Sequence, residues 1–191
     1  MSNILLWYAT RGAGAMTLIL LTGSVALGVM AAAKPASAAW PRFASAALHR
    51  NLALMSLAFL GLHIVTAAID PFTHLGWLVA VVPFSSYYRT FYLGLGTLAF
   101  DLLLAVAITS ALRSRLGQGV WRAVHWTVYA AWPIGLLHGL GTGSDAGSLW
   151  FLGITWACVL TVICAVWYRL SHGAGDTMSR AREEFRVNAQ P

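Results

Sequence analysis

Five long apolar runs divide the chain, and polar residues gather in the short stretches between them. The runs cover residues 13–33, 45–69, 90–112, 120–140 and 148–170. Each run has about 20 residues or slightly more, the length that an α-helix needs to cross the hydrocarbon core of a bilayer. In lipid a helix satisfies its own backbone polar groups. The pattern predicts an all-α, polytopic membrane bundle of about five transmembrane helices in residues 1–170, followed by a short tail in 171–191.

Two shorter segments lie beside these runs. Residues 75–84 are apolar but too short to span a bilayer, and they include Pro83. We expect them to form an interfacial or re-entrant cap on the outer face. The tripeptide Ala36-Ser37-Ala38 is similar to a signal-peptidase site. A cleaved signal has an apolar core of about 7–15 residues, so the longer first run favours a retained span, with cleavage as the alternative.

Composition excludes most other classes of protein. Apolar residues make up 59% of the chain and charged residues 9%, whereas a soluble domain carries about 25% charged residues. Trp and Tyr cluster at the ends of the runs, which is typical of the two bilayer interfaces. The basic residues lie between and after the runs and form no basic face, so nucleic acid is not an expected partner. Membrane lipid is the first expected partner.

The basic residues also predict an orientation. Two of the twelve, Arg11 and Arg89, fall on one side of the predicted bundle. The other ten fall on the opposite side: Lys34, Arg42, Arg50, Arg113, Arg115, Arg122, Arg169, Arg180, Arg182 and Arg186. Because cytoplasmic loops are enriched in Lys and Arg, we expect a multi-pass plasma-membrane protein with its N-terminus outside and its tail in the cytoplasm.

Four of the six histidines lie inside two of the predicted spans. His49 and His63 are 14 residues apart on the second span, and His125 and His138 are 13 apart on the fourth. At 1.5 Å per residue, each pair is separated by about 20 Å along its helix. Since these two spans run in the same direction, His49 and His125 would share a depth near the cytoplasm. His63 and His138 would share another near the outer face.

Two facing imidazoles at one depth are typical of a haem iron held by an axial ligand on each side. The chain has no CxxCH motif, so the haems would be non-covalent and b-type. Zinc fits poorly, because no carboxylate lies near these histidines in the sequence. The alternatives are packing histidines and chance placement, since a single intramembrane histidine is only a candidate for function.

The angular positions agree for one pair of histidines and not for the other. At about 100° per residue, 14 residues place His63 about 40° from His49, whereas 13 residues place His138 about 140° from His125. Pro133 lies between the latter two, and a proline kinks a helix. We expect a kink or local rewinding there to bring His138 into line.

Further residues are candidates for contacts with the haems. Arg50 and Arg122 neighbour the inner histidines and would pair with haem propionates, although the charge rule alone also explains them. Arg89, with Arg11 and His74, would do the same on the outer side, and anchoring at the interface is the alternative. The many glycines in the spans would let a flat ring approach a helix, or would simply allow close helix packing.

Several segments of the sequence resemble those of a known superfamily. The resemblance lies in segments 48–52 (LHRNL), 61–63 (GLH), 109–110 (TS), 121–125 (WRAVH), Tyr129 and 137–138 (LH). These segments are similar to the ferric reductase-like transmembrane domain, found in NADPH oxidases, ferric reductases and the haem subunit of bacterial methionine sulfoxide reductase systems. The resemblance implies two b-type haems stacked across the membrane, with His49, His63, His125 and His138 as their ligands.

The chain departs from some of these relatives after the last span. NADPH oxidases and eukaryotic ferric reductases carry a domain that binds FAD and NAD(P)H. Here 21 residues follow Leu170, and they contain no Gly-rich dinucleotide fingerprint. We therefore expect a separate electron donor, either a flavoprotein or a quinol.

The leading functional hypothesis is a transmembrane cytochrome b. It would pass electrons between two bis-histidine haems to an acceptor such as ferric iron, oxygen, a quinone or a flavoprotein, and the direction stays open. One alternative is a quinol-oxidising cytochrome b subunit of a larger complex, and another is a haem-free transporter whose histidines carry protons. Whether the chain is itself an enzyme also stays open; an oxidoreductase working with a separate donor fits best.

Overall fold

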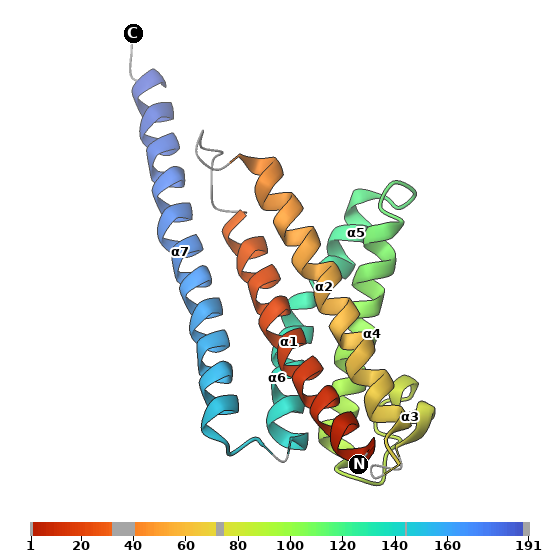
Figure 1. Ribbon diagram of the computed structural model, residues 1–191. Coiled ribbons are helices and arrows are strands. Elements are labelled where there is room, and N and C mark those ends of the chain that lie inside the picture. Colours follow the sequence, from red (N-terminus) through yellow and green to blue (C-terminus); the bar gives the residue numbers. More distant parts are fainter. Residues whose placement is uncertain (1, 32–40, 72–74, 144, 189–191) are drawn as a thin grey trace.

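The computed structural model describes residues 2–31, 41–71, 75–143 and 145–188 (Figure 1). These residues form seven helices and no strand, which agrees with the predicted all-α class. The helices are α1 (Ser2–Ala31), α2 (Arg42–Ile69), α3 (Gly76–Val81), α4 (Thr90–Ala111), α5 (Gln118–His125), α6 (Val128–Thr142) and α7 (Leu149–Asn188).

Four of the helices are long and apolar enough to cross a membrane. They contain the candidate spans Ile4–Ala31, Phe43–Ile69, Thr90–Ala111 and Leu149–Ser171. Each corresponds to one of the predicted apolar runs. Large apolar side chains such as Leu104, Trp156 and Leu160 point outward on these helices, as expected where lipid replaces water. The chain is therefore a multi-pass membrane protein.

The fourth predicted run is divided between α5 and α6. The continuous helix expected there ends at His125 and resumes at Val128. Backbone bonds from Thr127 to Val124, from Tyr129 to Trp126 and from Ala130 to Thr127 span three residues instead of four. The fifteen residues of α6 extend about 22 Å at 1.5 Å per residue, less than the roughly 30 Å of a hydrocarbon core. A count of five spans therefore stays a prediction.

The position of this interruption corrects one expectation. Pro133 lies inside α6, which continues on both sides of it, and the break comes earlier, at Trp126 and Thr127. Winding at three residues per turn rotates each residue by about 120° instead of about 100°. The tightened stretch therefore rotates His138 in the direction that reduces its offset from His125.

Helix α1 lies at the centre of the bundle, between α2, α6 and α7. Its side chains Leu21, Val25, Ala26 and Val29 are buried against residues of α4, α6 and α7. The indole of Trp132 on α6 donates a 2.9 Å hydrogen bond to the Thr22 hydroxyl on α1. Such bonds between membrane helices typically contribute about 0.6 kcal/mol. Because α1 contacts both α2 and α6, it fixes the position of these two helices relative to each other.

A short helix, α3, packs against α2 and α4 at the end of the bundle where α1 begins (Figure 1). α3 falls within the segment that was expected to form a cap, and the Thr97 hydroxyl of α4 donates a hydrogen bond to the Val79 carbonyl, at 2.7 Å. The N-terminus lies at this end, whereas α7 ends at the opposite one (Figure 1). α7 continues to Asn188, so the backbone of the expected tail is helical that far. Ala36-Ser37-Ala38 and His74 lie outside the described residues.

Candidate functional site

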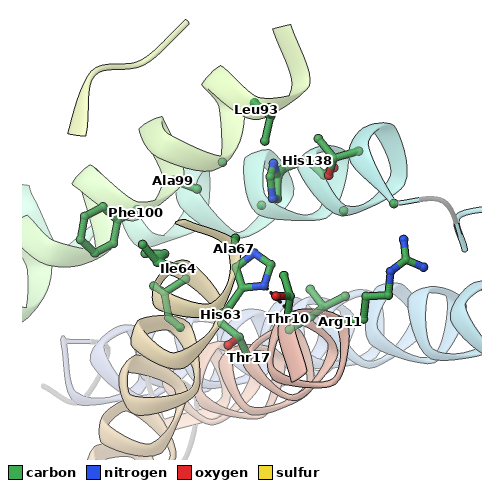
Figure 2. Close-up of a pocket in the computed structure, with 18 of the residues that line it drawn as sticks. Thr10, Arg11, Thr17, His63, Ile64, Ala67, Leu93, Ala99, Phe100 and His138 are labelled. Carbon is green, nitrogen blue, oxygen red and sulfur yellow. Dashed lines mark hydrogen bonds between the residues drawn. The ribbon is translucent and has the colours of Figure 1, made fainter. Parts of the chain in front are cut away.

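The structure places the four intramembrane histidines in two facing pairs. The ring centres of His49 on α2 and His125 on α5 are 6.2 Å apart, and the ring planes cross at 63°. Those of His63 on α2 and His138 on α6 are 6.1 Å apart and cross at 83°. Figure 2 shows His63 and His138 pointing toward each other across a cavity. We call these two sets the inner pair and the outer pair.

The spacing within each pair suits one metal ion held between two imidazoles. A metal–nitrogen bond to histidine is about 2 Å long, and a ring centre lies roughly 1.1 Å behind its nitrogen, so two opposed rings have centres about 6 Å apart. Both measured separations match this value. Imidazoles in direct contact through a hydrogen bond would also be close, but that contact requires one ring to donate to the other.

Hydrogen bonds favour the metal interpretation for three of the four rings. Nδ1 of His63 lies 2.7 Å from the Thr10 carbonyl, Nδ1 of His138 lies 2.8 Å from the Tyr92 carbonyl, and Nδ1 of His49 lies 2.9 Å from the Ser24 carbonyl. A carbonyl only accepts, so each Nδ1 carries the proton. The lone pair is then left on Nε2. This is the usual arrangement of a metal-ligating histidine, whose other nitrogen donates to a backbone carbonyl or a carboxylate.

A glycine makes room for each of these three rings. A Cβ built on Gly14 would lie 3.0 Å from Nδ1 of His63, and one on Gly28 would lie 3.5 Å from Cε1 of His49. A Cβ on Gly96 would overlap the ring of His138. In each case the glycine follows the carbonyl residue by four positions: Thr10 and Gly14, Ser24 and Gly28, Tyr92 and Gly96.

This repeated arrangement is a signal that the sequence reasoning missed. Residues i and i+4 lie on the same face of a helix, one turn apart. An imidazole that reaches the carbonyl of residue i must therefore pass over residue i+4, where a side chain would block it. The sequence signal is a polar or aromatic residue followed four positions later by glycine. Where this signal lies at the depth of a histidine, it points to α1 and α4 as the helices that support the imidazoles.

His125 is held differently from the other three. Its Nδ1 is buried and has no hydrogen-bond partner among the described residues. Its ring instead stacks on Trp121, with ring centres 5.0 Å apart and planes tilted by 27°. His125 is also the last residue of α5, immediately before the break in the helix. The inner pair therefore consists of one hydrogen-bonded ring and one stacked ring.

The outer pair faces a cavity of about 220 Å³. Its walls come from α1, α2, α3, α4, α6 and the start of α7, and Ala, Leu and Gly residues make up more than half of them (Figure 2). Arg11 lies at one end of the cavity and forms an ion pair with Asp145. Concave, largely apolar cavities with a few polar groups are typical of cofactor sites. A flat apolar ring with acidic side groups matches this lining.

The arginines suggested as contacts for the cofactor occupy different settings. Arg50 and Arg122 are exposed beside the inner pair. Arg89 donates a hydrogen bond to the Gly141 carbonyl at the end of α6 and does not line the cavity. Arg11 does line the cavity, so among the outer arginines it is the better placed to meet an anionic group there.

Other metal chemistry finds little support in the described part of the chain. No group of three or more His, Cys, Asp or Glu side chains there is placed to hold a metal ion. The cysteines are both free, with Cys158 buried and Cys164 exposed. Two-ligand sites, each made of facing imidazoles, are therefore the arrangement that the structure offers.

Comparison with known proteins identifies the family of the chain. Residues 13–136, more than half of the chain, match the family described as "Ferric reductase like transmembrane component". The match includes His49, His63 and His125 and ends two residues before His138. No curated protein and no solved structure matches the chain. The family match suggests a membrane electron-transfer role. The chain belongs to the ferric reductase-like transmembrane family.

Proposed function

We propose that this protein is a cytochrome b that carries electrons across the plasma membrane on two b-type haems. His49 and His125 would be the axial ligands of the inner haem, and His63 and His138 those of the outer haem. The observation that carries the proposal is the combination of ring separations near 6 Å with three Nδ1–H groups that donate to backbone carbonyls. This combination supports an Nε2 lone pair on both rings of the outer pair and on His49 of the inner pair, as metal ligation would require.

A bound haem would supply a one-electron carrier, and residues of the chain would hold its iron, surround its ring and pair with its propionates. The carbonyls of Thr10, Ser24 and Tyr92 fix the orientation of three imidazoles and make them more basic ligands. The walls of the outer cavity are mostly apolar, so they would surround most of the ring with apolar groups. Arg11 is the candidate partner for a propionate in the outer site, with Arg89 second, and Arg50 and Arg122 are the candidates in the inner site. Arg11 forms an ion pair with Asp145, which also lines this cavity.

Electrons would enter from the cytoplasm. Arg50, Arg113, Arg115 and Arg122 are exposed at the inner end of the bundle. A basic surface attracts an acidic protein and accelerates its association. We therefore propose that the donor is a separate flavoprotein that docks beside the inner pair, and that a quinol is the alternative donor. The acceptor would be reached through the outer site.

The donor can be tested with purified, haem-loaded protein under anaerobic conditions. We expect NADH or NADPH alone to give no rapid reduction, and the same nicotinamide with a flavin reductase to reduce the haems. The substitution Arg115→Glu should slow the flavoprotein-dependent rate severalfold, and added salt should slow the rate of the unsubstituted protein, because exposed charges are screened. Rapid reduction by nicotinamide alone would contradict the proposal. Reduction by a quinol but not by the flavoprotein would leave only the alternative donor.

The orientation can be tested by cysteine labelling. In a background of Cys158→Ser and Cys164→Ser, the change Gly147→Cys adds a thiol in the outer loop, where a Cβ meets nothing within 4 Å. We expect an impermeant maleimide to label this variant in intact cells. The matched variant Ser114→Cys, in the exposed loop after α4, should be labelled only after permeabilisation. The reverse result would place the N-terminus in the cytoplasm.

A further inference from the structure

Among the four paired histidines, His125 of the inner pair is the one whose ring makes no described hydrogen bond to a backbone carbonyl. Three imidazoles donate Nδ1–H to carbonyls of α1 or α4, whereas Nδ1 of His125 is buried without a partner among the described residues. A buried polar atom without a partner is unfavourable, and no hydrogen bond fixes the orientation of this ring. Something else must set the position of the His125 ring.

Trp121 is the group in contact with that ring. The two residues lie four positions apart on α5, so their side chains share one face of the helix. Their rings are nearly parallel, with centres 5.0 Å apart and planes tilted by 27°. An offset stack of this kind stabilises a fixed ring orientation beyond the burial of the two surfaces, so it can replace the hydrogen bond that the other three histidines make.

Trp121 is itself held in place from α4 and the loop that follows it. Its Nε1–H donates to the Ser110 hydroxyl at 3.3 Å. The guanidinium of Arg113 lies over the indole, with its central carbon 4.3 Å from the ring centre. A guanidinium in this position is attracted to the face of the indole. Ser110, Arg113 and Trp121 thus form a clamp on His125, which we call the inner clamp.

We propose that Trp121 is the positioning residue of the inner site, and that stacking on it takes the role that a backbone carbonyl has for the other three histidines. The inference rests on the proposed haem ligation by His125. Without the clamp, the His125 imidazole would leave the iron readily, and a small neutral ligand such as carbon monoxide would take the coordination position. Loss of the clamp would not make the outer site reactive toward carbon monoxide, because both imidazoles there donate hydrogen bonds to carbonyls.

The test is carbon monoxide binding by the reduced, purified protein. We expect the unsubstituted protein to hold two low-spin haems with little reactivity toward carbon monoxide. Trp121→Leu should make up to half of the haem reactive, whereas Trp121→Phe, which keeps a stacking ring, should behave like the unsubstituted protein. Trp167→Leu is the matched control, because Trp167 is an exposed tryptophan on α7 near the same end of the bundle.

A second variant tests the proposal if Trp121→Leu does not fold. The double change Ser110→Ala and Arg113→Gln loosens the clamp through two exposed side chains. We expect it to make a smaller, measurable part of the haem reactive. The proposal is wrong if neither variant exceeds the Trp167→Leu control. If the unsubstituted protein binds no haem at all, the proposed function fails instead, so the two failures are distinguishable.

Discussion

Replacing any one of the four paired histidines by alanine should reduce the haem content from two per chain to one. His63→Ala or His138→Ala removes a ligand of the outer site, and His49→Ala or His125→Ala removes a ligand of the inner site. A b-type haem has no covalent bond to the chain, so a site with one ligand left retains it weakly. The remaining haem should keep a low-spin spectrum, because the other pair lies about 20 Å away along α2.

Double variants give the sharper version of this experiment. His49→Ala with His125→Ala damages one site twice, so one haem per chain should remain. His49→Ala with His138→Ala damages both sites, so none should remain. Pyridine haemochrome analysis against protein concentration measures the difference. The pairing would be wrong if the first double variant lost both haems while the second retained one.

Substituting the supporting glycines by alanine should give a graded loss that follows the measured contacts. Gly28→Ala should be tolerated, because the added Cβ lies 3.5 Å from His49, an ordinary contact. Gly14→Ala should weaken the outer haem, because its Cβ lies 3.0 Å from Nδ1 of His63 and the ring must shift. Gly96→Ala should abolish the outer haem, since its Cβ would overlap the ring of His138.

Gly61→Ala is the matched control for this series. Gly61 is an exposed residue of α2 in the same part of the bundle, and a Cβ there meets nothing within 4 Å. It should keep both haems and be at least as stable as the unsubstituted protein, because alanine favours helix over glycine. Equal haem loss in Gly61→Ala and Gly96→Ala would mean that helix packing, and not room for an imidazole, explains the effect.

Much of the fold follows from hydropathy. Apolar length predicted the helices α1, α2, α4 and α7, and the short apolar segment with Pro83 predicted an element that does not span. Hydropathy could not locate the break after His125, because Trp126 and Thr127 do not interrupt the apolar pattern. The break arises from backbone bonds that span three residues, and local winding of this kind leaves no mark on composition.

The sequence also predicted one part of the candidate site and not the other. Spacing along two parallel spans predicted which histidines would face each other, because depth follows from a rise of 1.5 Å per residue. The support of those histidines depends on neighbouring helices that are distant in sequence. Thr10, Ser24 and Tyr92 act through backbone carbonyls, so in the sequence only the glycine four positions after each of them marks the role. The sequence likewise could not show that Arg11 lines the cavity and Arg89 does not, because the cavity is formed by helices that are distant in the sequence.

The measurement that tests the central claim most directly is the haem content of the unsubstituted protein. Protein purified from haem-sufficient cells should show a Soret band, and pyridine haemochrome analysis should give close to two b-type haems per chain. Acid acetone should extract them, because the chain has no CxxCH motif for covalent attachment. A colourless protein without a Soret band would contradict the account.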